Sequence, residues 1–173
     1  VFSPVRKGEY EGDRVPYKES FSPECNYFTF IVDGWIYYEG EGPTELWLLD
    51  IHSAILRPIV IGRWPVFKLW DYPVQSVQPD WSPDEDEIVF GDSEFGIEIY
   101  NMRTMKRRWL VGPGPAGFRP KWSYDGKWIA SYQLGENRNA DSDSILVISL
   151  DGKKKAVTGQ CSFFSSIEWS PRD

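Results

Sequence analysis

The chain has 173 residues, of which 41% are hydrophobic and 16% aromatic, and a formal net charge of −7. This length and composition are enough for one domain with a real core, and they exclude an intrinsically disordered chain. The acidic balance argues against a nucleic-acid-binding protein, which would carry a basic patch, and no apolar run approaches the ~20 residues that a transmembrane helix needs.

The abundance of Trp, Tyr and Phe favours β-strands over helices, because aromatic side chains suit a pleated sheet. Residues 1–25 are predicted to be an N-terminal extension that could add an outer strand at 14–21. The first set of short apolar runs follows, with one strand around Phe30 and three more at 35–38, 46–49 and 56–61. No helical period is found along the chain.

The next two sets of runs each begin with a Trp-Ser step. Their later runs lie at 87–90, 97–100 and 106–111 in the second set, and at 128–132, 145–148 and 155–158 in the third. The Trp residues of the three steps, Trp81, Trp122 and Trp169, lie 41 and 47 residues apart. A weaker copy puts Phe30 in the Trp position, 51 residues before Trp81. A fourth set therefore begins at 166–169.

The turns between the first and second runs have recognisable chemistry. Pro83 pre-sets the backbone for a type I turn, and the Asp-Gly step at 125–126 is a strong hairpin signal. Each Trp before such a turn is large enough to fill the space between adjacent sheets. We therefore expect Trp81, Trp122 and Trp169 to occupy equivalent, largely buried positions.

Four short strands in about 45 residues, with a Trp-Ser-Pro-Asp turn after the first, are the pattern of β-propeller blades. The string resembles the TolB-type propeller repeat more than the WD repeat, because no Trp-Asp pair ends the third strand. It is also similar to the propeller lids of prolyl-oligopeptidase-like peptidases. The resemblance covers residues 26–171. It implies an all-β fold, a partial β-propeller of about three four-stranded blades plus an extra strand; the alternative is a β-sandwich.

The resemblance divides residues 26–173 into propeller-like repeats. The expected blades span 26–73, 74–114 and 115–160, and 161–173 start the next blade. Propellers typically have about four to eight blades, so three blades leave a ring open with exposed sheet edges. Either the chain is part of a longer protein, or a protein partner or second chain completes the ring.

No catalytic motif is found in the sequence, which lacks a Gly-x-Ser-x-Gly elbow, a phosphate-binding glycine loop and a His-Glu-x-x-His pair. We therefore expect neither an enzyme nor a cofactor site. The single histidine, His52, is predicted to be a turn residue. Cys25 and Cys161 are expected to be small buried or half-buried thiols without a disulfide bond. Asp141 and Asp143 could bind calcium, although a solvated loop is favoured over a metal site.

Aromatic residues gather in the connections between the sets. The connection at 62–77 exceeds the median length of about five residues, and long connections are often functional. In a propeller such connections lie on one face. The candidate partner-binding residues are the aromatic ones of these connections, Trp64, Phe67, Trp70, Tyr72, Phe118, Phe163 and Phe164. The alternative is that several of them plug the channel or cover neighbouring blades.

Two functions fit these features. The first is a non-catalytic interaction or scaffold subunit that binds a protein partner as part of a periplasmic or extracellular assembly, with a cytoplasmic location as the alternative. The second is the propeller lid fragment of a prolyl-oligopeptidase-like hydrolase. The chain begins at Val1 and not at Met, which is expected of a processed mature chain or of an excised fragment.

Overall fold

The computed structural model describes residues 14–34, 44–63, 68–69, 72–73, 78–92, 96–112, 116–133, 144–157 and 167–170. These residues form fourteen strands, and there is no helix among them. The predicted all-β fold is confirmed. The described part of the chain also contains no helix with the length and apolar character needed to span a bilayer.

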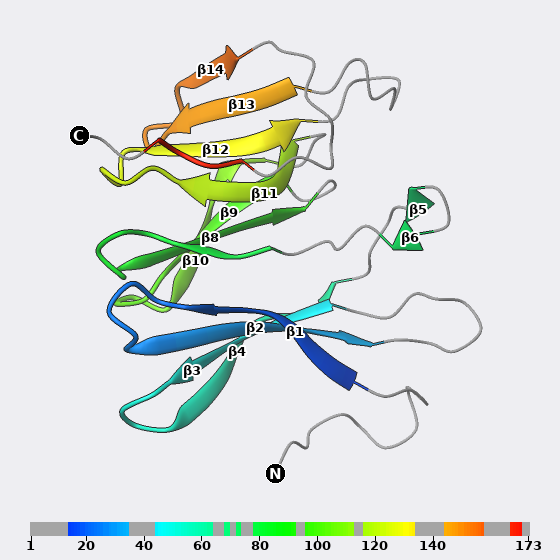
Figure 1. Ribbon diagram of the computed structural model, residues 1–173, viewed down its shortest axis with the longest axis vertical. Coiled ribbons are helices and arrows are strands. Elements are labelled where there is room, and N and C mark those ends of the chain that lie inside the picture. The colour runs from blue at the N-terminus through cyan, green and yellow to red at the C-terminus, as the bar shows by residue number, and fades with distance from the viewer. Residues whose placement is uncertain are drawn as a thin grey trace.

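Twelve of the strands form three four-stranded antiparallel sheets in chain order. The first sheet contains β1 (Arg14–Phe21), β2 (Tyr27–Gly34), β3 (Thr44–Asp50) and β4 (Ile55–Arg63). The second contains β7 (Asp80–Trp81), β8 (Glu87–Asp92), β9 (Gly96–Asn101) and β10 (Lys106–Val111). The third contains β11 (Ala116–Trp122), β12 (Trp128–Gln133), β13 (Ser144–Ser149) and β14 (Lys154–Val157). Figure 1 shows the second sheet between the first and the third.

Two interfaces between successive sheets form the core. Ile31, Leu46 and Leu48 of the first sheet pack against Trp81, Ile88 and Phe90 of the second. On its other face, the second sheet packs Val89, Ile97 and Ile99 against Trp122, Ile129 and Ile148 of the third. Successive residues of a strand point to opposite faces, so the unbroken apolar run at 88–90 serves both interfaces. This arrangement of separate, successive sheets is not the β-sandwich alternative.

The third and fourth strands of the first repeat lie where they were predicted, as β3 and β4, but its first strand is β1 and not the strand around Phe30. The strand predicted at 35–38 lies outside the described residues. Trp81 pairs with Ile88 across β7 and β8, and Trp122 pairs with Ile129 across β11 and β12. Phe21 likewise pairs with Phe28, seven positions later, across β1 and β2, so Phe21 takes the Trp position in the first sheet. The assignment to Phe30 was wrong, because Phe replaces Trp in this copy and the spacing to Trp81 is 60 residues.

This register changes the expected role of the N-terminal residues. The strand expected at 14–21 exists, but it is the first strand of the first sheet, equivalent to β7 and β11, and not an additional strand beyond the fourth. The boundary expected at residue 26 consequently falls in the turn between β1 and β2.

The three turns after these aromatic positions share one hydrogen-bond pattern. The Ser82 N–H donates to the carbonyl of Glu87 at 2.9 Å, and the Glu87 N–H donates back to the Ser82 hydroxyl at 2.9 Å. The same reciprocal bonds join Ser123 to Trp128 and Ser22 to Tyr27. Serine stabilises this turn because its short hydroxyl reaches the neighbouring backbone.

The fourth copy of the repeat differs from the prediction. The extra strand was expected at 166–169, but residues 167–170 lie in no strand. A first strand pairs only with the second strand of its own sheet, and no residue after Ser170 is described. Trp169 still packs beside Ala130, Tyr132 and Ile167, although it is half-buried where Trp81 and Trp122 are buried.

His52 lies in the turn between β3 and β4, as predicted, with its Nε2 atom 2.8 Å from Oδ1 of Asn26. Cys25 carries a free thiol but is exposed, so the expected burial was wrong. It lies in the β1–β2 turn, one residue before Asn26. Cys161 lies outside the described residues, and the absence of a disulfide stays a prediction.

Candidate functional site

Most of the predicted site residues lie outside the described part of the chain: Trp64, Phe67, Trp70, Asp141, Asp143, Phe163 and Phe164. The backbone places Tyr72 in β6 (Tyr72–Pro73) and Phe118 in β11. β6 pairs with β5 (Lys68–Leu69) in a small hairpin that stands apart from the three large sheets (Figure 1). The aromatic connection therefore contains a short two-stranded element. Its role in partner binding stays a prediction.

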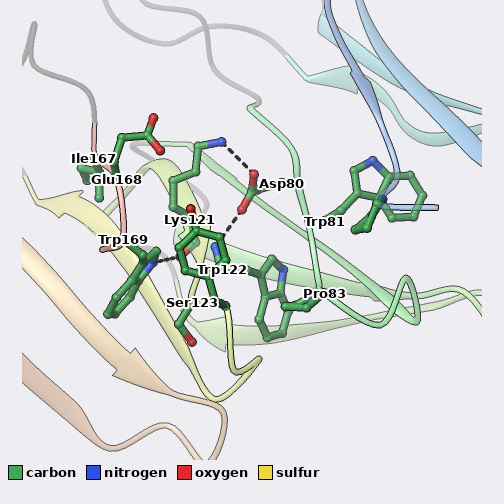
Figure 2. A pocket seen from close by; sticks show the side chains of 11 residues that line it. Asp80, Trp81, Pro83, Lys121, Trp122, Ser123, Ile167, Glu168 and Trp169 are labelled. Carbon is green, nitrogen blue, oxygen red and sulfur yellow. Dashed lines mark hydrogen bonds and ion pairs between the residues drawn. The ribbon is translucent and has the colours of Figure 1, made fainter. Parts of the chain in front are cut away.

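A pocket of about 360 Å³ opens where the first strands end in their Ser turns. The first strands β7 and β11 each begin at an aromatic connection and end at a Ser turn. The pocket therefore lies at the other end of these first strands from the aromatic connections, which were predicted to bind a partner. Figure 2 shows its wall, which combines aromatic, proline and charged side chains, among them Asp80, Trp81, Pro83, Lys121, Trp122, Glu168 and Trp169.

Asp80 joins the first strands of the second and third sheets. Its Oδ1 accepts a hydrogen bond from the Lys121 ammonium at 2.7 Å, and its Oδ2 accepts one from the Trp122 N–H at 2.7 Å (Figure 2). Burial raises the pKa of the Asp80 carboxyl above its ordinary value, against the opposing effects of Lys121 and the Trp122 N–H. Both carboxylate oxygens accept hydrogen bonds from the third sheet, so Asp80 links the second sheet to the third.

Trp169 continues the chain of contacts across the pocket. Its indole Nε1 donates to the Lys121 carbonyl at 3.0 Å (Figure 2). The neighbouring Glu168 carboxylate contributes to the raised pKa of Asp80. Lys121 therefore bonds to Asp80 through its side chain and to Trp169 through its backbone, which connects three successive copies of the repeat.

Two of the three turn serines at this end of the sheets, Ser82 and Ser123, also donate hydrogen bonds within their own turns. Ser82 Oγ donates to Asp84 Oδ1 at 2.6 Å, and Ser123 Oγ donates to Asp125 Oδ1 at 2.7 Å. Within the described ranges His52 is bonded to Asn26 and not to a serine. The same ranges contain no group of three His, Cys, Asp or Glu side chains that could hold a metal ion. A non-enzymatic role stays a prediction.

Glu85 makes a second link between sheets, which sequence reasoning missed. Its carboxylate accepts hydrogen bonds from the Asn26 side chain at 2.8 Å and from the Glu24 N–H, both in the β1–β2 turn. Burial favours a raised pKa for Glu85, but the hydrogen bonds from Ser22, Asn26 and Glu24 outweigh it and lower the pKa. Beside this link, the Tyr27 ring stacks on Trp81 with centroids 5.7 Å apart.

No protein-family model matches the chain, and no curated protein matches it. Solved structures do match. TolB from Acinetobacter baumannii has 17% identity and a TM-score of 0.58 over 82% of this chain and 32% of its own. The acylaminoacyl peptidase of Pyrococcus horikoshii has 11% identity and a TM-score of 0.61 over 91% of this chain and 26% of its own.

The β-propeller domain of the Trilobed protease from Pyrococcus furiosus has 10% identity and a TM-score of 0.56, over 90% of this chain and 46% of its own. The chain thus spans between a quarter and a half of the length of these structures. At these identities the likeness shows the fold alone. The chain is a partial β-propeller. Its three sheets are blades, and the first strands β1, β7 and β11 correspond between them.

The propeller has an open face on its first blade. Trp81 and Trp122 are 6% and 7% exposed, because each packs against the preceding blade. Phe21 holds the same position on the first blade and is 59% exposed. Its ring contacts Phe28 of its own blade, with centroids 4.8 Å apart.

Proposed function

We propose that this chain is a non-catalytic interaction module that works as a subunit or scaffold within a larger assembly. The exposure of Phe21 carries the proposal. An aromatic ring in this position of the repeat is covered in the second and third blades, so the first blade offers a ready-made surface for another blade or a partner protein.

The aromatic connections support the same function. The seven residues predicted there are of the types that anchor protein interfaces, and Trp and Tyr commonly dominate their binding energy. We propose that the repeats are of the TolB type, and that the assembly is periplasmic or extracellular. A second chain of the same kind, or a different protein, completes the ring.

The test is recovery of the partner from the native assembly with variant chains that remain folded. We expect both Phe21→Asp and Trp64→Ala/Trp70→Ala to reduce recovery strongly. Tyr124→Ala is the control, because Tyr124 is 61% exposed but lies on the rim of the pocket. Recovery that is equal for all three variants would remove both surfaces from the proposal.

A second candidate is the propeller domain of a hydrolase. It is favoured by the likeness to the acylaminoacyl peptidase and to the propeller domain of the Trilobed protease, of which this chain covers 26% and 46%. This function requires an α/β-hydrolase domain in the same polypeptide. Peptidase activity of the whole protein on an acylated peptide would support it, and a protein without such a domain would exclude it.

A further inference from the structure

The three outermost strands carry positive charge in an acidic chain. β4, β10 and β14 contain seven of the 19 Lys and Arg residues and none of the 26 Asp and Glu residues. The rest of the chain holds twelve basic and 26 acidic residues, a net charge of −14. Cations on an edge strand also discourage pairing with other chains, so charge alone does not identify a binding site.

Exposed apolar side chains accompany these cations at the boundary between the first and second blades. Ile55 of β4 is 57% exposed, Met105 before β10 is 59% exposed, and Trp109 of β10 is 49% exposed. Charged side chains alone are enough to keep an edge strand from pairing with other chains, so that role does not explain the exposed apolar side chains. Together with Arg57 and Arg107 these residues define the outer seam.

The register of the strands places the residues of the outer seam on facing sides of the two blades. Arg57 pairs with Leu48, which is buried in the first interface. Arg107 pairs with Tyr100, which is buried in the same interface. Directly paired residues share a face of the sheet, so Arg57 and Arg107 face each other's blade. Arg57 Nη1 reaches Met105 Sδ at 3.5 Å, which connects the two sides.

Both guanidinium groups can receive an incoming carboxylate. Arg57 pairs with no carboxylate among the described residues and is only partly buried; its Nε atom is buried, so an incoming carboxylate would meet its Nη atoms. Arg107 has one contact with Glu98, at 3.6 Å, and its side chain is 45% exposed. A guanidinium has five N–H donors, so much of the donor capacity of both groups is unused.

We propose that the outer seam binds an acidic, extended segment of a partner protein. Its carboxylates pair with Arg57 and Arg107, and its apolar side chains cover Ile55, Met105 and Trp109. A line of residues between two blades suits a single extended chain better than a flat membrane. Two of the three apolar residues are aliphatic and give nucleic-acid bases no ring to stack on. This surface is additional to the open face of the proposed function.

The test measures fluorescence anisotropy of a short labelled peptide of alternating Glu and Leu, titrated with the full chain. We expect saturable binding that Arg57→Glu/Arg107→Glu weakens by at least about tenfold. Lys127→Glu/Lys153→Glu is the matched control, because it makes the same charge change on exposed turns of the third blade. Trp109→Ala should also weaken binding, and this variant keeps both arginines and the Met105 contact.

Four results would overturn the proposal. They are no binding of the peptide, equal weakening by the seam and control variants, tighter binding of phosphatidylserine vesicles or oligothymidine through the same residues, and a concentration-dependent dimer that only the seam variants abolish. The last result would assign the outer seam to a second copy of this chain. None of them bears on the open face at Phe21, so the proposed function is tested separately.

Discussion

Glu85 holds the first two blades together through a carboxylate whose pKa is lowered in the folded protein. A lowered pKa stabilises the fold above the ordinary value of 4.5, and this contribution is lost as the pH falls through the lower folded value. We expect Glu85→Gln to reduce the free energy of unfolding by about 1.5–3 kcal/mol at pH 7, the range for hydrogen bonds to a charged group.

The pH dependence distinguishes this link from simple packing. The difference between wild type and Glu85→Gln, measured by urea unfolding, should shrink as the pH falls below 4.5. Glu19→Gln changes an exposed carboxylate of β1 and should have little effect at either pH. A difference for Glu85→Gln that stays constant between pH 7 and pH 3 would contradict the assignment.

Each Ser turn contains a four-residue β-turn that begins at the serine, and the fourth residue has a left-handed backbone. Its φ is 59° at Cys25, 59° at Glu85 and 68° at Gly126. Glycine adopts this conformation without the cost of about 1–2 kcal/mol that other residues meet. We expect Cys25→Gly to stabilise the protein by about 0.5–1 kcal/mol and Gly126→Ala to destabilise it by about 1 kcal/mol.

Thermal unfolding of the two variants checks the turn assignment. A Cβ atom at Gly126 would meet Pro83 at an ordinary contact distance of 3.7 Å, so the expected loss comes from the backbone and not from a clash. Changes of the same sign in both variants would show that the two turns are not equivalent.

At the scale of the blade, the same repeat position has opposite surroundings in different copies. Trp122 is buried between the second and third blades, and Trp122→Ala should cost about 3–5 kcal/mol by leaving a cavity. Phe21→Ala should cost less than about 1 kcal/mol in the isolated chain, because its ring is mostly exposed. Urea unfolding measures both. A neutral Trp122→Ala would refute its place between blades.

The elements were largely predictable because each strand carries a local signal. The apolar runs at 87–90, 97–100 and 128–132 became β8, β9 and β12. The first copy was misplaced because Phe21 lacks the indole that marks the others, and the long connection stretches the spacing. The Glu85 link was missed because its partners lie 59 and 61 residues away, where no local pattern connects them.

At the scale of the molecule, three blades leave two unlike ends. The first blade exposes Phe21, whereas the third is partly covered by Ile167 and Trp169. The first strand of the third blade, β11, lies beside the first two strands of the second blade, β7 and β8, and the fourth strand of each blade is at an edge of its sheet. We therefore propose different roles for different places: closure or partner binding at the open face, and recognition of an acidic segment at the outer seam.

Hydroxyl-radical footprinting of Phe21, in the isolated chain and in the native assembly, tests directly whether another surface covers the open face. We expect Phe21 to react readily in the isolated chain and to be protected in the assembly, because another surface covers the open face. Trp81 and Trp122 should be protected in both samples, since their cover lies within the chain. Equal reactivity of Phe21 in the two samples would contradict the proposal that the first blade binds a neighbour.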